Sequence, residues 1–477
     1  MKIKKNLFRT TMYLLVVGVL LFSSCEEDTD SSSVTLTADA GNDVTVDVGQ
    51  QVNLDGSNSD INSGTLTYLW EFTSKPGGSN VQIQNAASVS ASFTPDVAGD
   101  YVVNLEVSDG NGEVDQDEKN VSALSDVVEI SEDITTDQTW TEGTLYRVTN
   151  YISINSGAKL TIEPGVTVEF AEDAGLKVSS DNSVLVAAGT QDKPVILTGQ
   201  QEIRGYWRGV FIGSSSVDNI MEHVDISYGG STNMATYFDK TNMVIDLAKI
   251  TLRNVSFTGS AGYGIQTRRD GSTFSIENSE FNNNANSDML IHPTQVDFVD
   301  NLTNFNGGEV EVYGGDTEDS GSETWSNLNN GNFYLSGSVT IDNNVSIEAG
   351  ALFEMGTNVK LKVSGGYIKA NGTSSDRIVF SGKSKAKGAW AGILIASSSV
   401  KNEMDYVKIE YGGGTDLDIY MDAGNIGVYN DAYISLTNAL IENSANYGTI
   451  VRESRDAVME MSNVNYSGID NDNHYIY

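Results

Sequence analysis

The sequence predicts an all-β protein in which a β-sandwich is followed by a long solenoid of stacked parallel strands. Short runs that alternate apolar and polar residues fill the chain, and turn-forming glycine is frequent, with 47 Gly among 477 residues. Such alternation is typical of strands, and no segment carries the apolar stripe of a helix of useful length. A second observation is an internal duplication at an offset of 183 residues, which is typical of solenoids.

Residues 1–25 are expected to form a lipoprotein signal peptide. Four basic residues within Met1–Arg9 precede the apolar run Met12–Phe22, which is too short to span a bilayer comfortably. Phe22-Ser23-Ser24-Cys25 resembles a bacterial lipobox, which implies that Cys25 is acylated and becomes the first residue of the mature chain. Phe22 departs from the Leu of that pattern. The alternative is cleavage by the ordinary signal peptidase, with Cys25 unmodified.

Residues 26–33 are expected to be an acidic flexible tether. Glu26–Asp30 holds four acidic residues and is followed by three Ser, a composition that stays solvated. The segment also resembles the acidic export signal of Bacteroidetes-type surface lipoproteins. That resemblance implies an outer membrane lipoprotein, held in the membrane by its N-terminal lipid and facing the cell exterior. The periplasmic face is the alternative.

Residues 34–124 are expected to form one antiparallel sandwich. The alternating runs are Val44–Val48, Val52–Leu54, Thr67–Phe72, Val89–Phe93 and Tyr101–Val107. Together, Leu54–Ser57, Tyr68–Phe72 and the stretch from Phe93 to Tyr101 resemble a PKD-type domain, an immunoglobulin-like module. We expect Trp70 to lie in the core between the sheets. The resemblance implies a spacer or adhesion module without catalysis.

The rest of the chain contains a tandem duplication. The matched segments are Trp207–Asn219 with Trp390–Asn402, Val224–Gly230 with Val407–Gly413, Leu160–Gly165 with Val345–Gly350, and Ile250–Asn254 with Ile434–Asn438. We expect a parallel β-helix with about seven coils of ~20–25 residues in each copy, because a single coil cannot bury its own apolar face. Asn-rich turns, such as Asn278 and Asn282–Asn284, suit stacked amide ladders.

Residues 125–320 are assigned to the first copy and residues 321–477 to the second, stacked as one solenoid. The acidic, Gly-rich linker Gly314–Ser322 makes two separate helices the alternative. The string Leu160–Phe170, followed by Pro194–Gly199 and Trp207–Val210, resembles the right-handed parallel β-helix (pectin-lyase-like) proteins of bacterial surfaces. The resemblance implies the fold and no single activity, because this scaffold carries lyases, hydrolases and adhesins.

Charge and composition exclude several functions. The chain has 65 Asp+Glu and 28 Lys+Arg, a formal charge of −37. A nucleic-acid partner is excluded, because phosphates are bound by clustered Lys and Arg. One Cys and three His exclude a disulfide framework and argue against a Cys- or His-based metal site. No cofactor is expected, Ca²⁺ bound by carboxylates remains open, and we expect a monomer.

Recurring arginines are the first candidate ligand-binding residues. Arg268 and Arg269 in the first copy correspond to Arg452 and Arg455 in the second. Planar guanidinium groups on an exposed strand face suit carboxylates and sugar rings. The alternative is local ion pairing, Arg269 with Asp270 and Arg455 with Asp456.

A recurring Asp and Asn are the second candidates. Asp239 and Asn242 match Asp422 and Asn425, in the longest insertion of each copy. Carboxylate and amide groups at this spacing suit a sugar or Ca²⁺. The alternative is that these residues only form turns.

The leading hypothesis is a cell-surface-anchored, non-catalytic binding or adhesion lipoprotein that contacts glycans or extracellular matrix through the β-helix. Polar groups that recur in both copies favour a repeated weak binding face, since two sites on one rod gain by avidity. The rival is a polysaccharide lyase or glycoside hydrolase, which needs carboxylates and a base in one groove. It would be favoured if Arg268 or Arg269 shared a groove with three or more Asp or Glu. Trp207 and Trp390 suggest sugar platforms, but we expect them to pack at the coils.

Overall fold

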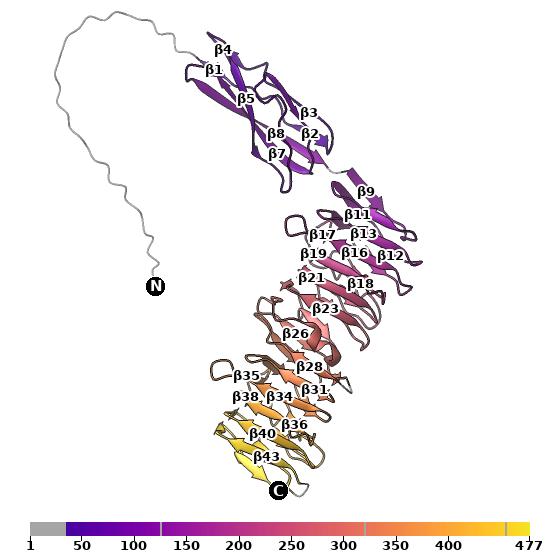
Figure 1. The fold of residues 1–477 in the computed structure, drawn as a ribbon, viewed down its shortest axis with the longest axis vertical. Coiled ribbons are helices and arrows are strands. Elements are labelled where there is room, and N and C mark those ends of the chain that lie inside the picture. Colours follow the sequence, from indigo (N-terminus) through magenta and orange to yellow (C-terminus); the bar gives the residue numbers. More distant parts are fainter. Residues whose placement is uncertain (1–34, 125, 319–320, 454–455) are drawn as a thin grey trace, which may run out of the picture.

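The computed structural model describes residues 35–477 except 125, 319–320 and 454–455 (Figure 1). The expected leader with Cys25, the tether and Arg455 lie outside the described residues. The described chain forms a sandwich followed by a rod, in which successive coils follow one another in sequence order (Figure 1). The predicted all-β class is confirmed. No helix in the described part of the chain is long and apolar enough to cross a membrane.

The N-terminal domain is a sandwich built around Trp70. Its strands are β1 (Leu36–Thr37), β2 (Val44–Asp47), β3 (Val52–Asp55), β4 (Asp60–Ile61), β5 (Thr67–Ser74), β6 (Ser90–Phe93), β7 (Gly99–Ser108) and β8 (Val114–Leu124). Trp70 is buried, and its indole N–H donates to the Ser88 carbonyl at 3.0 Å, which confirms the core prediction. The expectation of a wholly antiparallel sandwich is wrong at one edge, where β2 pairs parallel to β8.

The β-helix begins with an 11-stranded sheet in the first copy and a 13-stranded sheet that spans both copies. The 11-stranded sheet contains β9 (Asp126–Ile130), β10 (Gln138–Trp140), β11 (Thr144–Val148), β13 (Lys159–Ile162), β14 (Thr167–Phe170), β16 (Val184–Ala188), β17 (Val195–Gly199), β19 (Ile220–Ser227), β21 (Lys249–Thr258), β23 (Thr273–Glu277) and β24 (Glu280–Asn282). The 13-stranded sheet contains β12 (Tyr151–Ile154), β15 (Gly175–Val178), β18 (Gly209–Ile212), β20 (Thr241–Ile245), β22 (Tyr263–Gln266), β25 (Met289–Ile291), β26 (Glu309–Val312), β29 (Asn332–Leu335), β32 (Leu352–Met355), β35 (Ile378–Gly382), β38 (Val407–Glu410), β41 (Leu440–Glu442) and β44 (Asn465–Ser467).

Two further sheets complete the second copy. The seven-stranded sheet contains β27 (Gly315–Asp316), β30 (Val339–Ile341), β33 (Lys360–Val363), β36 (Gly392–Ile395), β39 (Gly424–Val428), β42 (Tyr447–Val451) and β45 (His474–Ile476). The six-stranded sheet contains β28 (Ser322–Trp325), β31 (Asn344–Ile347), β34 (Tyr367–Asn371), β37 (Glu403–Asp405), β40 (Tyr433–Thr437) and β43 (Val458–Ser462). A 3₁₀ helix, η1 (Pro293–Phe298), lies between β25 and β26.

The two copies form one continuous solenoid, as predicted, and the alternative of two separate helices is wrong. Met289 of β25 pairs with Val310 of β26, and β26 pairs in turn with β29. The 13-stranded sheet therefore crosses the junction without a break. Its 13 strands, one in each coil, agree with the expectation of about seven coils per copy.

The second copy is turned about the rod axis by one face relative to the first. The matched segments that follow Trp207 and Trp390 form β18 and β36, yet β18 belongs to the 13-stranded sheet and β36 to the seven-stranded sheet. The same holds for β22 and its counterpart β42. Side chains that match in sequence therefore lie on different faces of the rod.

Inward side chains stack from coil to coil. The rings of Phe333, Phe353 and Phe380 lie parallel, with centroids 5.1 and 5.3 Å apart, close to the spacing of neighbouring strands. Trp207 and Trp390 are fully buried, and their indole N–H groups donate to backbone carbonyls at 2.7 and 2.9 Å. Both tryptophans are core residues, as expected.

Corners of the coils use left-handed residues. Asn254 and Asn278 have φ of 52° and 46°, a conformation that Asn tolerates better than most residues. The Asn278 amide donates to the Asn254 side chain at 2.6 Å, so the expected amide ladder is present there. Asn284 departs from it, because its amide bonds the Phe257 carbonyl and the Asp288 carboxylate instead.

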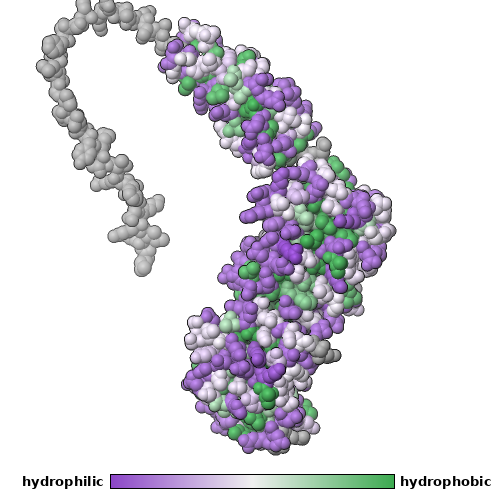
Figure 2. Space-filling model, viewed as in Figure 1, coloured by the Kyte–Doolittle hydropathy of each residue, from purple (hydrophilic) through white to green (hydrophobic). Residues whose placement is uncertain are grey.

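The surface is largely hydrophilic on the face seen in Figure 2, and apolar residues gather mainly over the first coils of the β-helix. This agrees with the acidic composition, because solvated carboxylates cover the outside of the rod while apolar side chains fill its interior.

Candidate functional site

The first-copy arginines are both ion-paired, with partners one coil away. Arg268 Nη2 lies 2.7 Å from Asp239 Oδ2, and Arg269 Nη2 lies 2.5 Å from Asp246 Oδ2. The expected pair of Arg269 with Asp270 is wrong, because stacking brings the preceding coil closer than the next residue along the chain. The structure thus joins two of the candidates, Arg268 and Asp239.

A cavity of about 630 Å³ opens beside these arginines, on the outer side of the 13-stranded sheet. Its lining combines aromatic rings with charged groups: Tyr237, Phe238, Tyr263, Arg268, Arg269, Leu290, Glu311, Tyr313 and Ser336. The sheet forms the floor, because Leu290 and Glu311 are register partners on β25 and β26. The insertion that holds Tyr237, which is 72% exposed, forms one wall.

Glu311 lies among hydroxyl donors at this floor. Its Oε2 accepts from Tyr263 Oη at 3.3 Å and from Ser287 Oγ at 3.1 Å. Burial, and then the charge of Glu311, raises the pKa of Tyr263 above its usual value. Burial likewise raises the pKa of Tyr313 to about 12. Both phenols therefore stay protonated. Tyr263 donates its hydrogen to Glu311 and Tyr313 donates its hydrogen to the Arg268 carbonyl, so their oxygens are left to accept from a ligand.

A second cavity, of about 550 Å³, shares Tyr263 and Glu311 with the first and extends toward Glu309 and Tyr334. Lys383 forms an ion pair with Glu309, lies 3.2 Å from Glu354, and holds its ammonium 4.6 Å from the Tyr334 ring centroid. Although burial favours the neutral amine, these carboxylates raise the pKa of Lys383. The two cavities form one groove across β22, β25, β26 and β29.

Asn242 and Asn425 have structural roles in place of the expected ligand contacts. Both are fully buried. Asn242 Oδ1 accepts the N–H of Gly229 at 2.8 Å, and its Nδ2 donates to the Thr258 carbonyl at 3.1 Å. Asn425 makes the matching bonds to Gly412, Ile409 and Glu442. Their amides tie neighbouring coils together and do not reach the groove.

The second-copy arginine has different surroundings. Arg452 lies 5.5 Å from the ring centroids of Tyr420 and Tyr429 and 5.6 Å from that of Tyr477. Its Nη1 donates to the Tyr420 carbonyl. Asp422 is exposed, and the side chain of Arg452 contacts a carbonyl and three aromatic rings in the described chain.

The groove brings Arg268 and Arg269 together with three carboxylates, which is the condition set for an enzyme. One carboxylate, Glu311, lines the cavity with Arg268 and Arg269, while Asp239 contacts Arg268 and Glu309 lines the neighbouring cavity. In the described ranges, no group of three or more His, Cys, Asp or Glu is arranged to hold a metal ion.

Sequence reasoning missed Glu309, Glu311 and Tyr313. Their signal is the alternation of Glu309–Tyr313, in which polar side chains at every second position share one face of a strand. The segment is easily overlooked because it lies at the boundary of the two copies, where the repeat offers no second example.

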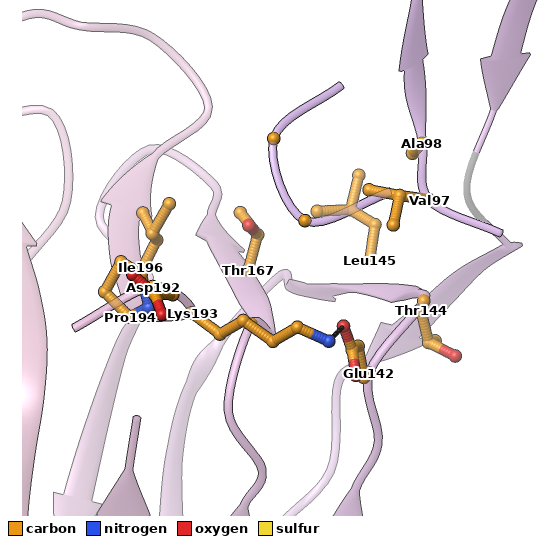
Figure 3. A pocket seen from close by; sticks show the side chains of 14 residues that line it. Val97, Ala98, Glu142, Thr144, Leu145, Thr167, Asp192, Lys193, Pro194 and Ile196 are labelled. Carbon is orange, nitrogen blue, oxygen red and sulfur yellow. Dashed lines mark hydrogen bonds and ion pairs between the residues drawn. The ribbon is translucent and has the colours of Figure 1, made fainter. Parts of the chain in front are cut away.

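Another cavity, of about 300 Å³, lies between the sandwich and the first coils (Figure 3). Val97 and Ala98 of the sandwich line it together with Thr144 and Leu145 of β11. Its ion pair joins Lys193 to Glu142 at 2.6 Å. Backbone and aliphatic groups dominate the rest of the lining, which is typical of a domain junction.

Two family models match the chain. One describes a PKD domain and matches residues 40–122, and the other, "Pectate-lyase like beta helix domain", matches residues 132–236. Among curated proteins, Protein bark beetle of Drosophila melanogaster is 44% identical over 61 residues, which are 13% of this chain and 2% of that protein. The chain thus spans a very small share of that relative's length.

Two solved structures are similar to parts of the chain. The PKD domain from KIAA 1837 protein is 37% identical, with a TM-score of 0.17, over 20% of this chain and 90% of that chain. A nucleoside hydrolase-related hypothetical protein from Saccharophagus degradans, associated with carbohydrate metabolism, is 22% identical, with a TM-score of 0.17, over 19% of this chain and 25% of that chain.

The family models agree with the architecture of the two domains. The chain contains a PKD domain and a pectate-lyase-like β-helix domain.

Proposed function

We propose that this protein is a surface-anchored, non-catalytic glycan-binding lipoprotein that binds its ligand in the groove of the first copy. The groove supports this proposal because Tyr237, Tyr263 and Tyr313 place aromatic rings around Arg268 and Glu311. Aromatic faces pack against the apolar C–H faces of sugars, while phenol, guanidinium and carboxylate groups bond sugar hydroxyls.

A matched pair of tyrosines tests the binding site. Tyr237 and Tyr420 occupy equivalent insertions and are 72% and 57% exposed. Tyr237→Ala should weaken binding to a glycan array and to its best oligosaccharide at least about fivefold, because a stacking surface is lost. Tyr420→Ala, away from the groove, should leave the affinity unchanged. Equal effects of both variants would contradict the proposed site.

The anchor is tested separately. Acylation of Cys25 would retain the protein in the membrane fraction, because two acyl chains give stable anchoring. Cys25→Ala should release it into the soluble fraction. Protease treatment of whole cells then distinguishes the exterior face from the periplasmic face. A Cys25→Ala protein that stays with salt-washed membranes would contradict the lipoprotein assignment.

Glycoside hydrolysis is the second candidate, favoured by one observation. Glu309 Oε1 and Glu311 Oε2 both lie near Ser287 Oγ, at 3.0 and 3.1 Å, so two carboxylates face one groove. Lys383 holds Glu309 in an ion pair, which favours a structural role for that carboxylate. Reducing-end and unsaturated-product assays should show no turnover. Turnover that Glu311→Gln abolishes would replace the binding proposal with hydrolysis.

A further inference from the structure

The cations around the groove are already neutralised. Each is ion-paired with carboxylates: Arg268 with Asp239, Arg269 with Asp246, Lys383 with Glu309 and Glu354, and Lys385 with Glu354. Arg268 and Arg269 each keep further N–H donors, but their charges are already offset by Asp239 and Asp246, so the groove offers a ligand carboxylate no net positive charge. Negative ligands are therefore disfavoured at this site.

Glu311 is the carboxylate that remains unmatched. It lines both cavities, and in the described part of the chain it accepts hydrogen bonds from the hydroxyls of Tyr263 and Ser287. A carboxylate offers about four acceptor positions, so two stay available to a ligand. The ion pairs around the groove contain four carboxylates and four cations, and Glu311 is a fifth carboxylate. The groove therefore carries an excess negative charge at its floor.

The rings around Glu311 also favour a positive charge. Tyr263 and Tyr313 line the same cavity, and Tyr334 lines the adjoining one. The face of an aromatic ring is negative and attracts an ammonium group. Lys383 already uses this attraction at Tyr334, at 4.6 Å. Carboxylate and ring faces together are the surroundings that an ammonium group prefers.

We infer that the groove selects glycans that carry free ammonium groups, that is, amino sugars without an N-acetyl group. This inference rests on the proposed glycan-binding function and adds its substrate class. The ammonium lies at Glu311, and the tyrosine rings cover the apolar faces of the sugar. The same charges disfavour uronic-acid polymers.

Isothermal titration calorimetry of the full chain tests the inference with three 1,4-linked tetrasaccharides: β-linked glucosamine, β-linked N-acetylglucosamine and α-linked galacturonate. The glucosamine oligomer should bind about tenfold more tightly than its N-acetylated counterpart, and the galacturonate should not bind. Added salt should weaken the first interaction and leave the second nearly unchanged.

Glu311→Gln should reduce the tenfold preference to within about twofold, because the amide keeps the size and removes the charge. Glu442→Gln is the matched control, since Glu442 faces outward on the same sheet and pairs with Lys408. It should keep the preference. Circular dichroism and melting curves confirm that both variants are folded.

The outcomes separate the two proposals. Equal binding of the glucosamine and N-acetylglucosamine oligomers, or a preference that Glu311→Gln leaves intact, overturns the inference while glycan binding stands. Binding of none of the oligosaccharides, alone or on a glycan array, overturns the proposed function itself. A tetralysine peptide that binds as tightly as the glucosamine oligomer would overturn both, and would indicate a basic peptide as the ligand.

Discussion

Asn425→Ala should be among the most destabilising substitutions in the second copy. The side chain is fully buried, and its Oδ1 accepts the Gly412 N–H at 2.9 Å. Its Nδ2 donates to the carbonyls of Ile409 at 3.1 Å and Glu442 at 2.9 Å. One amide therefore satisfies three backbone groups in the interior of the rod.

The expected loss follows from those three groups. A buried polar group left without a partner costs about 1–3 kcal/mol. Partial relaxation around the smaller side chain lowers the total, so we expect Asn425→Ala to reduce the free energy of unfolding by about 3–5 kcal/mol. A domain typically has about 5–15 kcal/mol in all, so this loss is large.

Urea unfolding followed by tryptophan fluorescence measures the effect, and amide hydrogen exchange locates it. Exchange is needed because coils of a solenoid can unfold separately. Asn301→Ala is the matched control, since Asn301 is exposed and has one side-chain contact of 3.5 Å. If Asn425→Ala and Asn301→Ala agree within about 0.5 kcal/mol, the reasoning that the amide holds the coils together is refuted.

Three further predictions concern the core, the pH response and the groove. Trp207→Phe should lower the unfolding free energy by about 1–3 kcal/mol in urea titrations, because the Ser227 carbonyl loses its indole donor. Burial raises the pKa of Asp288 to about 6 from 3.8, so the folded state binds an extra proton and the free energy of unfolding falls as pH rises through that interval. Asp288→Asn should therefore flatten this part of a plot of melting temperature against pH. A plot that the substitution leaves unchanged would contradict the prediction. Lys383→Met should lower the pH-7 melting temperature by about 1–2 °C, because Glu309 loses its ion-pair partner. A melting temperature equal to that of the unmodified protein would mean that the pair contributes nothing.

Most of the fold could be predicted from the alternation of apolar and polar residues and from the internal duplication. In Lys159–Ile162, apolar residues alternate with polar ones because every second side chain faces the core. Trp207 recurs as Trp390 because both fill the core of a coil. Both patterns can be seen in the sequence itself. The parallel edge of the sandwich at β2 could not be predicted in this way, because alternation specifies faces and not the direction of a partner strand.

The repeat also pairs two unlike side chains at one backbone corner. His223 and Tyr406 are equivalent positions with unlike side chains, yet their φ angles are 47° and 46°. What the two copies share there is the left-handed corner, which Asn254 and Asn438 also adopt one coil further on. The backbone turn, and not the side chain, is therefore what the two copies have in common here.

The candidate site was harder to predict because it joins residues that only stacking brings together. Arg268 and Asp239 were identified from their recurrence, whereas their ion pair depends on adjacent coils. Asn242 recurs for a structural reason, since each copy needs the hydrogen bonds of this amide to hold neighbouring coils together. Recurrence alone does not distinguish a binding residue from a structural one. The exposure of the side chain does, because a buried side chain cannot contact a ligand.

The junction between the copies explains why one copy carries the groove. In each copy, the insertion and the arginine that follows the Tyr-Gly strand are alike, but the next coil differs. In the first copy the next coil contributes β26, which brings Glu311 and Tyr313 beside Arg268. At Arg452 the neighbouring residue is Tyr477, whose ring packs near the guanidinium and whose hydroxyl donates to the Tyr420 carbonyl at 2.8 Å. Duplication thus supplied the same half-site twice, and the coil stacked next to it determined whether a ligand cavity or a packed aromatic cluster resulted.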